Sequence, residues 1–165
     1  MGAPVTINLA TGATFSVDTG GFTLPSGLNF ASSTDLMVGQ KVRLHPTGAP
    51  TGTPPNLMIT VDQVQLEPTY VTATITAINA GGNPQTLTLA TLPSFFTNAG
   101  ITSIQVDVLS NTQFETEEDQ KVSGLSSFKT GDTVSIRGPL FRTMTTPTMV
   151  AEKVVSRSTS SGSED

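Results

Sequence analysis

Residues 35–44 read DLMVGQKVRL, and residues 127–136 read SFKTGDTVSI. Both stretches place an apolar residue, two variable residues and a glycine before a segment that alternates apolar and polar side chains. Each predicts a tight turn that leads directly into a β-strand. We interpret Gly39 and Gly131 as turn residues with positive φ. A phosphate-binding loop would need a richer glycine and lysine pattern around them.

The elements that follow each turn come in the same order. A Pro- and Thr-rich loop follows each strand, at residues 45–56 and 137–148, and another strand follows each loop, at residues 57–66 and 149–155. An order of turn, strand, loop and strand that occurs twice indicates an internal duplication.

Apolar and polar side chains that alternate with period two predict the other strands. In the second half, residues 71–78 and 86–92 flank the turn signals of residues 80–84 and therefore predict a β-hairpin. A further strand is expected at residues 104–109, and in the first half at residues 5–9, 14–18 and 22–24. Proline near the start and glycine at the end predict one short helix at residues 93–100.

About five strands in each half predict an all-β fold of two tandem small Greek-key barrels of the OB type, related by an internal repeat and accompanied by one short helix. We expect the first barrel to span residues 3–67 and the second to span residues 68–157. The Ser-rich tail at residues 158–165 is expected to be disordered.

Composition excludes several classes of function. A net charge of −5 with 8 Lys and Arg residues, and no basic stripe, argues against a nucleic-acid partner. No apolar run approaches the roughly 20 residues of a transmembrane helix. The chain has no Cys, which excludes disulfides and thiolate metal sites. We expect no cofactor.

Three stretches carry a resemblance to a known family. Residues 28–40, 92–101 and 131–138 resemble the tandem β-domains of exported bacterial proteins of the acidobacterial type, catalogued as domain of unknown function 5666. The resemblance implies a β-domain fold and a location outside the cytoplasm, and it implies no activity. Because residues 1–4 do not read as a signal peptide, we expect an extracytoplasmic protein whose signal peptide is absent from this chain.

Four acidic residues form the one candidate metal site, and they are Glu115, Glu117, Glu118 and Asp119. Carboxylate oxygens so concentrated could bind calcium, which takes six to eight oxygen ligands. Their spacing differs from that of a calcium-binding loop, so we favour a solvated acidic loop.

Apolar residues in the second Pro- and Thr-rich loop form a candidate partner-binding tip. Leu140, Phe141 and Met144 have no obvious core to enter, and contiguous exposed apolar side chains mark interaction sites. The alternative is that the loop folds back over the mouth of the barrel.

His45 is the only histidine and the only candidate general base of this type. A hydrolase could use it with Asp35, Asp62 or a nearby serine. Nothing that resembles a nucleophile elbow or a paired acid motif accompanies it. We therefore expect no catalytic residues and no enzymatic activity.

The sequence favours a non-catalytic extracytoplasmic module that binds a protein or a component of the cell envelope, or that serves as a scaffold. Strand edges could add a partner strand or support self-association. The alternative is an OB-like domain that binds an oligosaccharide or a small molecule. Eight Phe, one Tyr and no Trp leave few flat rings for stacking on such ligands.

Overall fold

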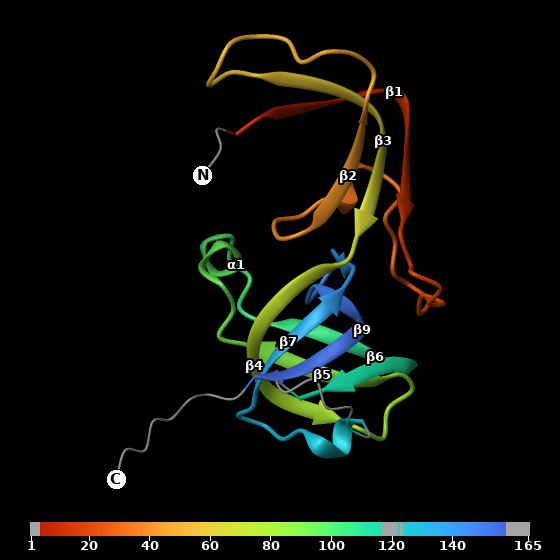
Figure 1. Ribbon diagram of the computed structural model, residues 1–165, viewed down its shortest axis with the longest axis vertical. Coiled ribbons are helices and arrows are strands. Elements are labelled where there is room, and N and C mark those ends of the chain that lie inside the picture. The colour runs from red at the N-terminus through yellow and green to blue at the C-terminus, as the bar shows by residue number, and fades with distance from the viewer. Residues whose placement is uncertain (1–3, 117–121, 123, 158–165) are drawn as a thin grey trace.

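The computed structural model describes residues 4–116, 122 and 124–157. Its strands form two sheets, one of three strands in the first half and one of six strands in the second half (Figure 1). A single α-helix of five residues accompanies them. The expected all-β class is confirmed. The predicted tail at residues 158–165 lies outside the described residues.

The second half is a closed barrel. Its elements are β4 (Thr69–Asn79), β5 (Gln85–Ala90), α1 (Ser94–Asn98), β6 (Ile104–Glu115), β7 (Thr133–Gly138), β8 (Leu140–Phe141) and β9 (Thr148–Arg157). The spatial order β7-β4-β5-β6 is a Greek key, and β9 pairs with both β7 and β6 to close five strands into a barrel. The predicted hairpin and the predicted Greek-key barrel are thus both formed here.

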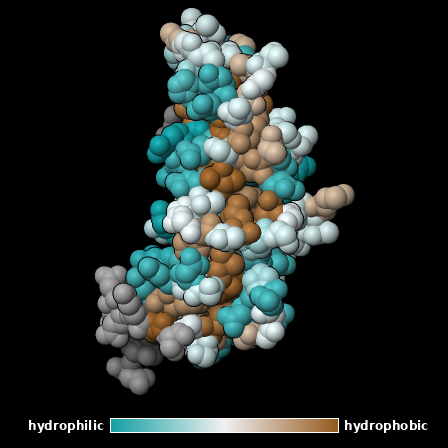
Figure 2. Space-filling model, turned by 90° about the vertical axis from the view of Figure 1, so that its right-hand side faces the viewer, coloured by the Kyte–Doolittle hydropathy of each residue, from teal (hydrophilic) through white to brown (hydrophobic). Residues whose placement is uncertain are grey.

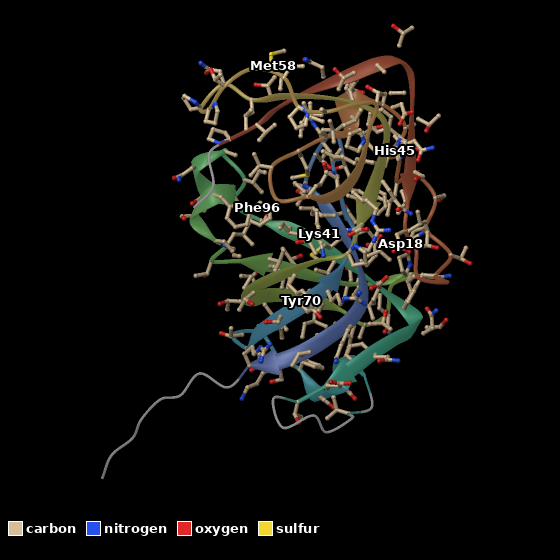
Figure 3. The ribbon with its side chains drawn as sticks, turned by 45° about the horizontal axis from the view of Figure 1, so that its top comes forward. Asp18, Lys41, His45, Met58, Tyr70 and Phe96 are labelled. Atoms are coloured by element: carbon tan, nitrogen blue, oxygen red, sulfur yellow. The ribbon has the colours of Figure 1, made fainter. Side chains whose placement is uncertain are left out.

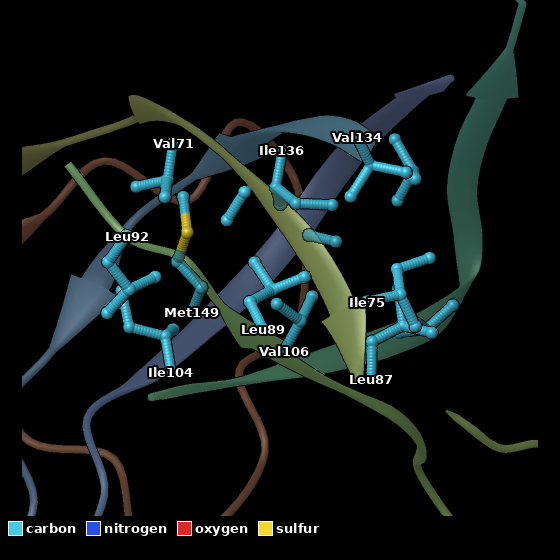
Figure 4. Close-up of a cluster of buried hydrophobic side chains, with 14 of the residues drawn as sticks. Val71, Ile75, Leu87, Leu89, Leu92, Ile104, Val106, Val134, Ile136 and Met149 are labelled. Carbon is cyan, nitrogen blue, oxygen red and sulfur yellow. The ribbon is translucent and has the colours of Figure 1, made fainter. Parts of the chain in front are cut away.

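Alternation along each strand fills the barrel. Alternate apolar residues over Val71–Ile75, Leu87–Leu89, Ile104–Val108 and Val134–Ile136 are buried in the barrel core, which is the pattern expected of a sheet with one face toward a core. Figure 4 shows these side chains meeting inside the barrel, among them Val71, Ile75, Leu87, Leu89, Val106 and Ile136.

Helix α1 begins after Pro93 and carries the fully buried Phe96, which belongs to the barrel core. A side chain at Gly39 would lie 2.5 Å from the ring of Phe96, and Gly39 has a φ of 91°. Gly131 has a φ of 96°. Both predicted turn glycines are therefore confirmed, and Gly39 also lets the first half approach the helix.

The first half is an open sheet, so the barrel expected at residues 3–67 is wrong. Its strands are β1 (Thr6–Val17), β2 (Lys41–Pro46) and β3 (Met58–Glu67), in the spatial order β1-β3-β2. The strands expected at residues 5–9 and 14–18 form one continuous strand, and residues 22–24 form none. Gly12, with a φ of 79°, lies in an irregularity of β1 that does not reverse the chain, so three strands remain and cannot close.

The two halves share a hydrophobic cluster. Phe141 and Val150 of the second half are buried against side chains of the first half, including Phe30, Val64 and Leu66. Nε2 of Gln40 also donates a hydrogen bond to the carbonyl of Leu140 at 2.9 Å. The sheets separate at Pro68, and the division into two domains stays a prediction because of this shared core.

Candidate functional site

The first sheet repeats three strands of the barrel in the same register. Leu9 of β1 pairs with Val61 of β3, and after the irregularity Thr14 pairs with Gln63. In the barrel, Val108 pairs with Ala151, and Gln113 pairs with Lys153. Across the irregularity, β1 and β6 each advance by five residues, while their partners β3 and β9 each advance by two. Strand β1 therefore corresponds to β6, and β3 corresponds to β9.

The correspondence extends to the third strand and to the loops. Leu44 of β2 pairs with Val64, as Ile136 of β7 pairs with Val154. A short 3₁₀ turn precedes each of these strands, at Ser33–Asp35 and at Leu125–Ser127. The isolated bridge between Thr51 and Met58 likewise matches the pairing of Phe141 with Thr148. The predicted duplication is thus visible in the pairing itself.

The hairpin formed by β4 and β5 has no counterpart in residues 4–67. In the barrel, β5 pairs with the outer edge of β6, and β4 pairs with the outer edge of β7. Among the described residues, β1 and β2 pair only with β3. Figure 1 shows β3 between them. The outer edges of β1 and β2 are therefore open where the barrel has two further strands.

The missing hairpin leaves apolar side chains uncovered in the first half of β1 and at Val5 just before it. Val5, Ile7 and Leu9 expose 39%, 39% and 36% of their surface. Their counterparts on β6 expose 0%, 0% and 3%, and they are Ile104, Val106 and Val108. Figure 2, which faces the right-hand side of Figure 1, shows a band of apolar residues that continues over both halves of the molecule. We call the outer edge of β1 at Val5, Ile7 and Leu9 the open edge.

The open edge carries backbone N–H and C=O groups that point away from β3. The N–H of Thr6 donates to the carbonyl of Leu57 at 2.9 Å, so Thr6 faces β3. Backbone groups of successive residues in a strand face opposite edges. Ile7, the next residue of β1, therefore directs its N–H and C=O groups outward, which is how an edge strand can pair with another chain.

Charged residues lie on the outer face of the first sheet. Arg43 Nε lies 2.8 Å from Glu67 Oε1, and Lys41 Nζ lies 3.9 Å from Glu67 Oε2. These exposed cations stand on β2, so the charged part of this sheet is separated by β3 from the apolar open edge (Figure 3). Lysine on an edge strand disfavours indiscriminate pairing between sheets.

His45 forms a surface hydrogen bond with Asp62, at positions that the duplication explains. Its Nδ1 lies 2.7 Å from Asp62 Oδ1, and both side chains are exposed. The same register positions in the barrel hold Arg137 and Glu152, whose Nη1 and Oε2 lie 2.8 Å apart. Asp35 does not join His45, because its carboxylate accepts hydrogen bonds from the backbone N–H groups of Ala31 and Ser32.

The serine nearest to His45 in the strand register is also not placed for catalysis. Ser16 lies on β1 and pairs with Gln65 of β3, whereas His45 lies on β2 and pairs with Gln63 of β3. Ser16 and His45 line one groove, but the intervening strand β3 separates them. No hydrogen bond between a nucleophile and His45 occurs in the described part of the chain.

Glu152 is a buried carboxyl at the surface of the barrel that faces the loop after β1. Burial raises the pKa of the Glu152 carboxyl above its ordinary value, while the Arg137 guanidinium acts to lower it and the Asp18 carboxylate acts to raise it. Gly20 lies against this carboxylate, so the loop after β1 covers it. The equivalent Asp62 has no such cover, and its side chain is 46% exposed.

The predicted acidic site is only partly described. Glu115 forms an ion pair with Lys153, with Oε2 and Nζ 2.9 Å apart. Glu117, Glu118 and Asp119 lie outside the described residues. Within the described ranges, no three His, Cys, Asp or Glu side chains come together as metal ligands.

The predicted partner-binding tip is wrong for two of its three residues. Leu140 and Phe141 are fully buried, because β8 pairs with β9 and directs them into the two hydrophobic clusters. Met144 is fully exposed. One isolated methionine does not form an apolar patch.

A groove of about 450 Å³ lies between the halves. It is lined by residues 36–38, 99–103, 142, 143 and 145–147. Arg142 supplies its only charge, and Nη1 of Arg142 already donates to the carbonyl of Thr34 at 3.2 Å. No Phe, Tyr or Trp is among these lining residues, so the groove has no ring on which a sugar could stack.

Comparison with known proteins leaves the family resemblance as a prediction. In the part of the chain that the structure describes, no helix is long and apolar enough to cross a membrane. No protein-family model matches the sequence, and no curated protein is significantly similar to it.

Proposed function

We propose that this chain is a non-catalytic binding module that takes up a β-strand of a protein partner at the open edge. The observation that carries the proposal is the contrast between β1 and β6. Equivalent residues are buried by a neighbouring strand in the barrel and exposed on β1. The low charge and high Thr content support a location outside the cytoplasm as part of the same proposal.

Both components of strand recognition are present at this edge. The outward backbone groups of Ile7 supply hydrogen bonds of the kind that bind any extended chain. The half-exposed side chains of Val5, Ile7 and Leu9 supply an apolar surface that selects a partner with apolar residues at alternate positions. The groove between the halves supports small-molecule or oligosaccharide binding less well, since its lining has no aromatic residue.

A peptide-binding experiment tests this function. The probes are ten-residue peptides that alternate Val or Ile with Thr, together with scrambled peptides of the same composition. We expect the full chain to bind the alternating peptides and not the scrambled ones, as measured by biolayer interferometry.

Two substitutions at one position provide the matched control. Ile7→Pro removes an N–H that points outward, and an edge strand tolerates proline at such a position. Ile7→Thr keeps that N–H. We expect Ile7→Pro to abolish binding and Ile7→Thr to retain it, with circular dichroism spectra unchanged. Equal binding by both variants, or no binding by the unmodified chain, would overturn the proposal.

A further inference from the structure

We propose that the ligand of the open edge is a β-hairpin of another polypeptide, which pairs with β1 through one strand and with β2 through the other and so closes a second five-stranded barrel. This inference rests on the proposed function and names the partner's structure. The second half of the same chain shows what such a closure looks like, because β4 and β5 occupy the equivalent place.

The geometry of the first sheet fits two strands. The pairs β1–β3 and β3–β2 have the same registers as β6–β9 and β9–β7. In the barrel, the remaining interval from β6 to β7 is filled by β5 and β4. A single strand on β1 would leave the edge of β2 unpaired, whereas a hairpin pairs with both edges.

The duplication also gives the positions at which the hairpin would pair. Leu87 of β5 pairs with Val106, the counterpart of Ile7, so one strand of the ligand places an apolar residue opposite Ile7. Val71 of β4 pairs with Ile136, the counterpart of Leu44, so the other strand places an apolar residue opposite Leu44.

These positions specify the chemistry of the ligand. The inward residues of the barrel hairpin are aliphatic and expose at most 3% of their surface, and they are Val71, Ala73, Ile75, Leu87 and Leu89. The residues between them include Thr72, Thr74, Thr86 and Thr88. The expected ligand therefore alternates small or branched aliphatic residues with threonine or similar polar residues in both strands.

The hairpin of this chain is not available as the ligand. Strands β4 and β5 pair with β7 and β6 of their own barrel, and their inward side chains are buried there. Releasing them would expose that core. A second copy that pairs edge to edge is the competing occupant, and the experiment distinguishes it.

The probe is a synthetic peptide with the sequence of residues 69–90, which is the hairpin of the barrel. Its controls are the separate strands, residues 69–79 and 85–90, and a hairpin in which Leu87→Lys places a charge opposite Ile7. The full chain is mixed with each peptide, and amide hydrogen exchange is followed by NMR. Light scattering on the unmixed chain over a range of concentrations reports self-association.

We expect the hairpin to bind at least ten-fold more tightly than either single strand, and the lysine variant not to bind. Exchange at Val5, Ile7 and Leu9 of β1, and at Val42 and Leu44 of β2, is expected to slow at least ten-fold. Exchange in β6 and β7 is expected to stay unchanged, because the peptide does not displace the chain's own hairpin.

A covalent version keeps the test decisive if the free peptide aggregates. A copy of residues 69–103 is joined directly before Val5, which reproduces the connection of β5 through α1 to Ile104. We expect the amides of Val5, Ile7 and Leu9 in this fusion to become as protected as those of Ile104, Val106 and Val108.

The outcomes separate the two proposals. If a single strand binds as tightly as the hairpin and protects only β1, strand addition stands and the hairpin inference fails. If no peptide binds and the fusion leaves β1 unprotected, both fail. If the unmixed chain forms a dimer whose edges are already protected, the occupant is a second copy and the hairpin inference is overturned.

Discussion

Strands β1 and β6 are equivalent in the duplication but differ in how far their apolar side chains are buried. Each has twelve residues, pairs in parallel with a long partner strand and contains the same irregularity. Val106 is fully buried, whereas its counterpart Ile7 is 39% exposed. The difference arises from β5, which pairs with β6 and has no equivalent beside β1 among the residues that the structure describes. The comparison teaches that an alternating strand specifies an apolar face, while the neighbouring strands decide whether that face is buried.

The largest expected effect comes from placing a charge at the two equivalent positions. Val106→Asp would bury an unpaired carboxylate in the barrel, and we expect it to lower the free energy of unfolding by about 4 kcal/mol or more. Ile7→Asp keeps its carboxylate in water, so its cost should stay below about 1 kcal/mol. Urea denaturation followed by circular dichroism measures both, and equal losses would contradict the comparison.

A second pair of positions lies at the ends of β2 and β7. A Cβ at Gly138 would overlap the carbonyl oxygen of Val150, so Gly138→Ala should cost about 1–3 kcal/mol through overpacking. The equivalent Pro46 is exposed, and Pro46→Ala should change the free energy of unfolding by about 0.5 kcal/mol or less. Thermal unfolding of both variants checks this, and a larger loss for Pro46→Ala would refute it.

The buried carboxyl of Glu152 predicts a pH dependence. Because burial raises the pKa of Glu152, the folded chain holds this proton more tightly than the unfolded chain. As the pH rises from the ordinary value of 4.5 through the raised pKa, the folded state therefore loses stability. Glu152→Gln lacks this loss. We expect the free energy of unfolding of the unmodified chain, minus that of the variant, to decrease with rising pH in urea titrations.

A difference that is constant with pH, or that increases, would contradict the assignment of this shift to Glu152. Asp18→Asn provides a control for the neighbouring carboxylate, which acts to raise the same pKa. In that variant the decrease should be smaller.

The exposed hydrogen bond between His45 and Asp62, at the equivalent place, should have the smallest effect. His45 and Asp62 are both largely in water, and exposed pairs of this kind contribute less than about 1 kcal/mol. We expect His45→Ala and Asp62→Asn each to change the free energy of unfolding by less than that amount. A coupling energy above about 1 kcal/mol between His45 and Asp62 in a double-mutant cycle would contradict this expectation.

Local pattern was sufficient to predict much of the barrel. The period-two alternation of residues 71–78 and 86–92, with turn residues between them, indicated the hairpin, and Pro93 with Gly100 indicated the helix. The repeated turn and strand indicated the duplication. These features depend on residues close together in the sequence, which is where pattern arguments are strongest.

The errors came from contacts between distant residues. Two strands were expected at residues 5–9 and 14–18, but both stretches pair with β3 as parts of one strand. Leu140 and Phe141 lie in a Pro- and Thr-rich loop, and only the short pairing with β9 brings them into the core. The open edge was missed as a specific site because nothing in residues 5–9 shows that a neighbouring strand is lacking. Comparison of these residues with 104–108 was the signal that could have found it.

Amide hydrogen exchange of the isolated chain, resolved by NMR at each residue, tests the central claim most directly. Ile7 directs its N–H into solvent, whereas Val106 pairs with Leu87 in the closed barrel. We predict that Ile7 exchanges at close to the rate of an unstructured peptide, while Val106 exchanges only on global unfolding. Equal protection of the two amides in a monomeric chain would contradict the account, since it would mean that the edge of β1 is already covered.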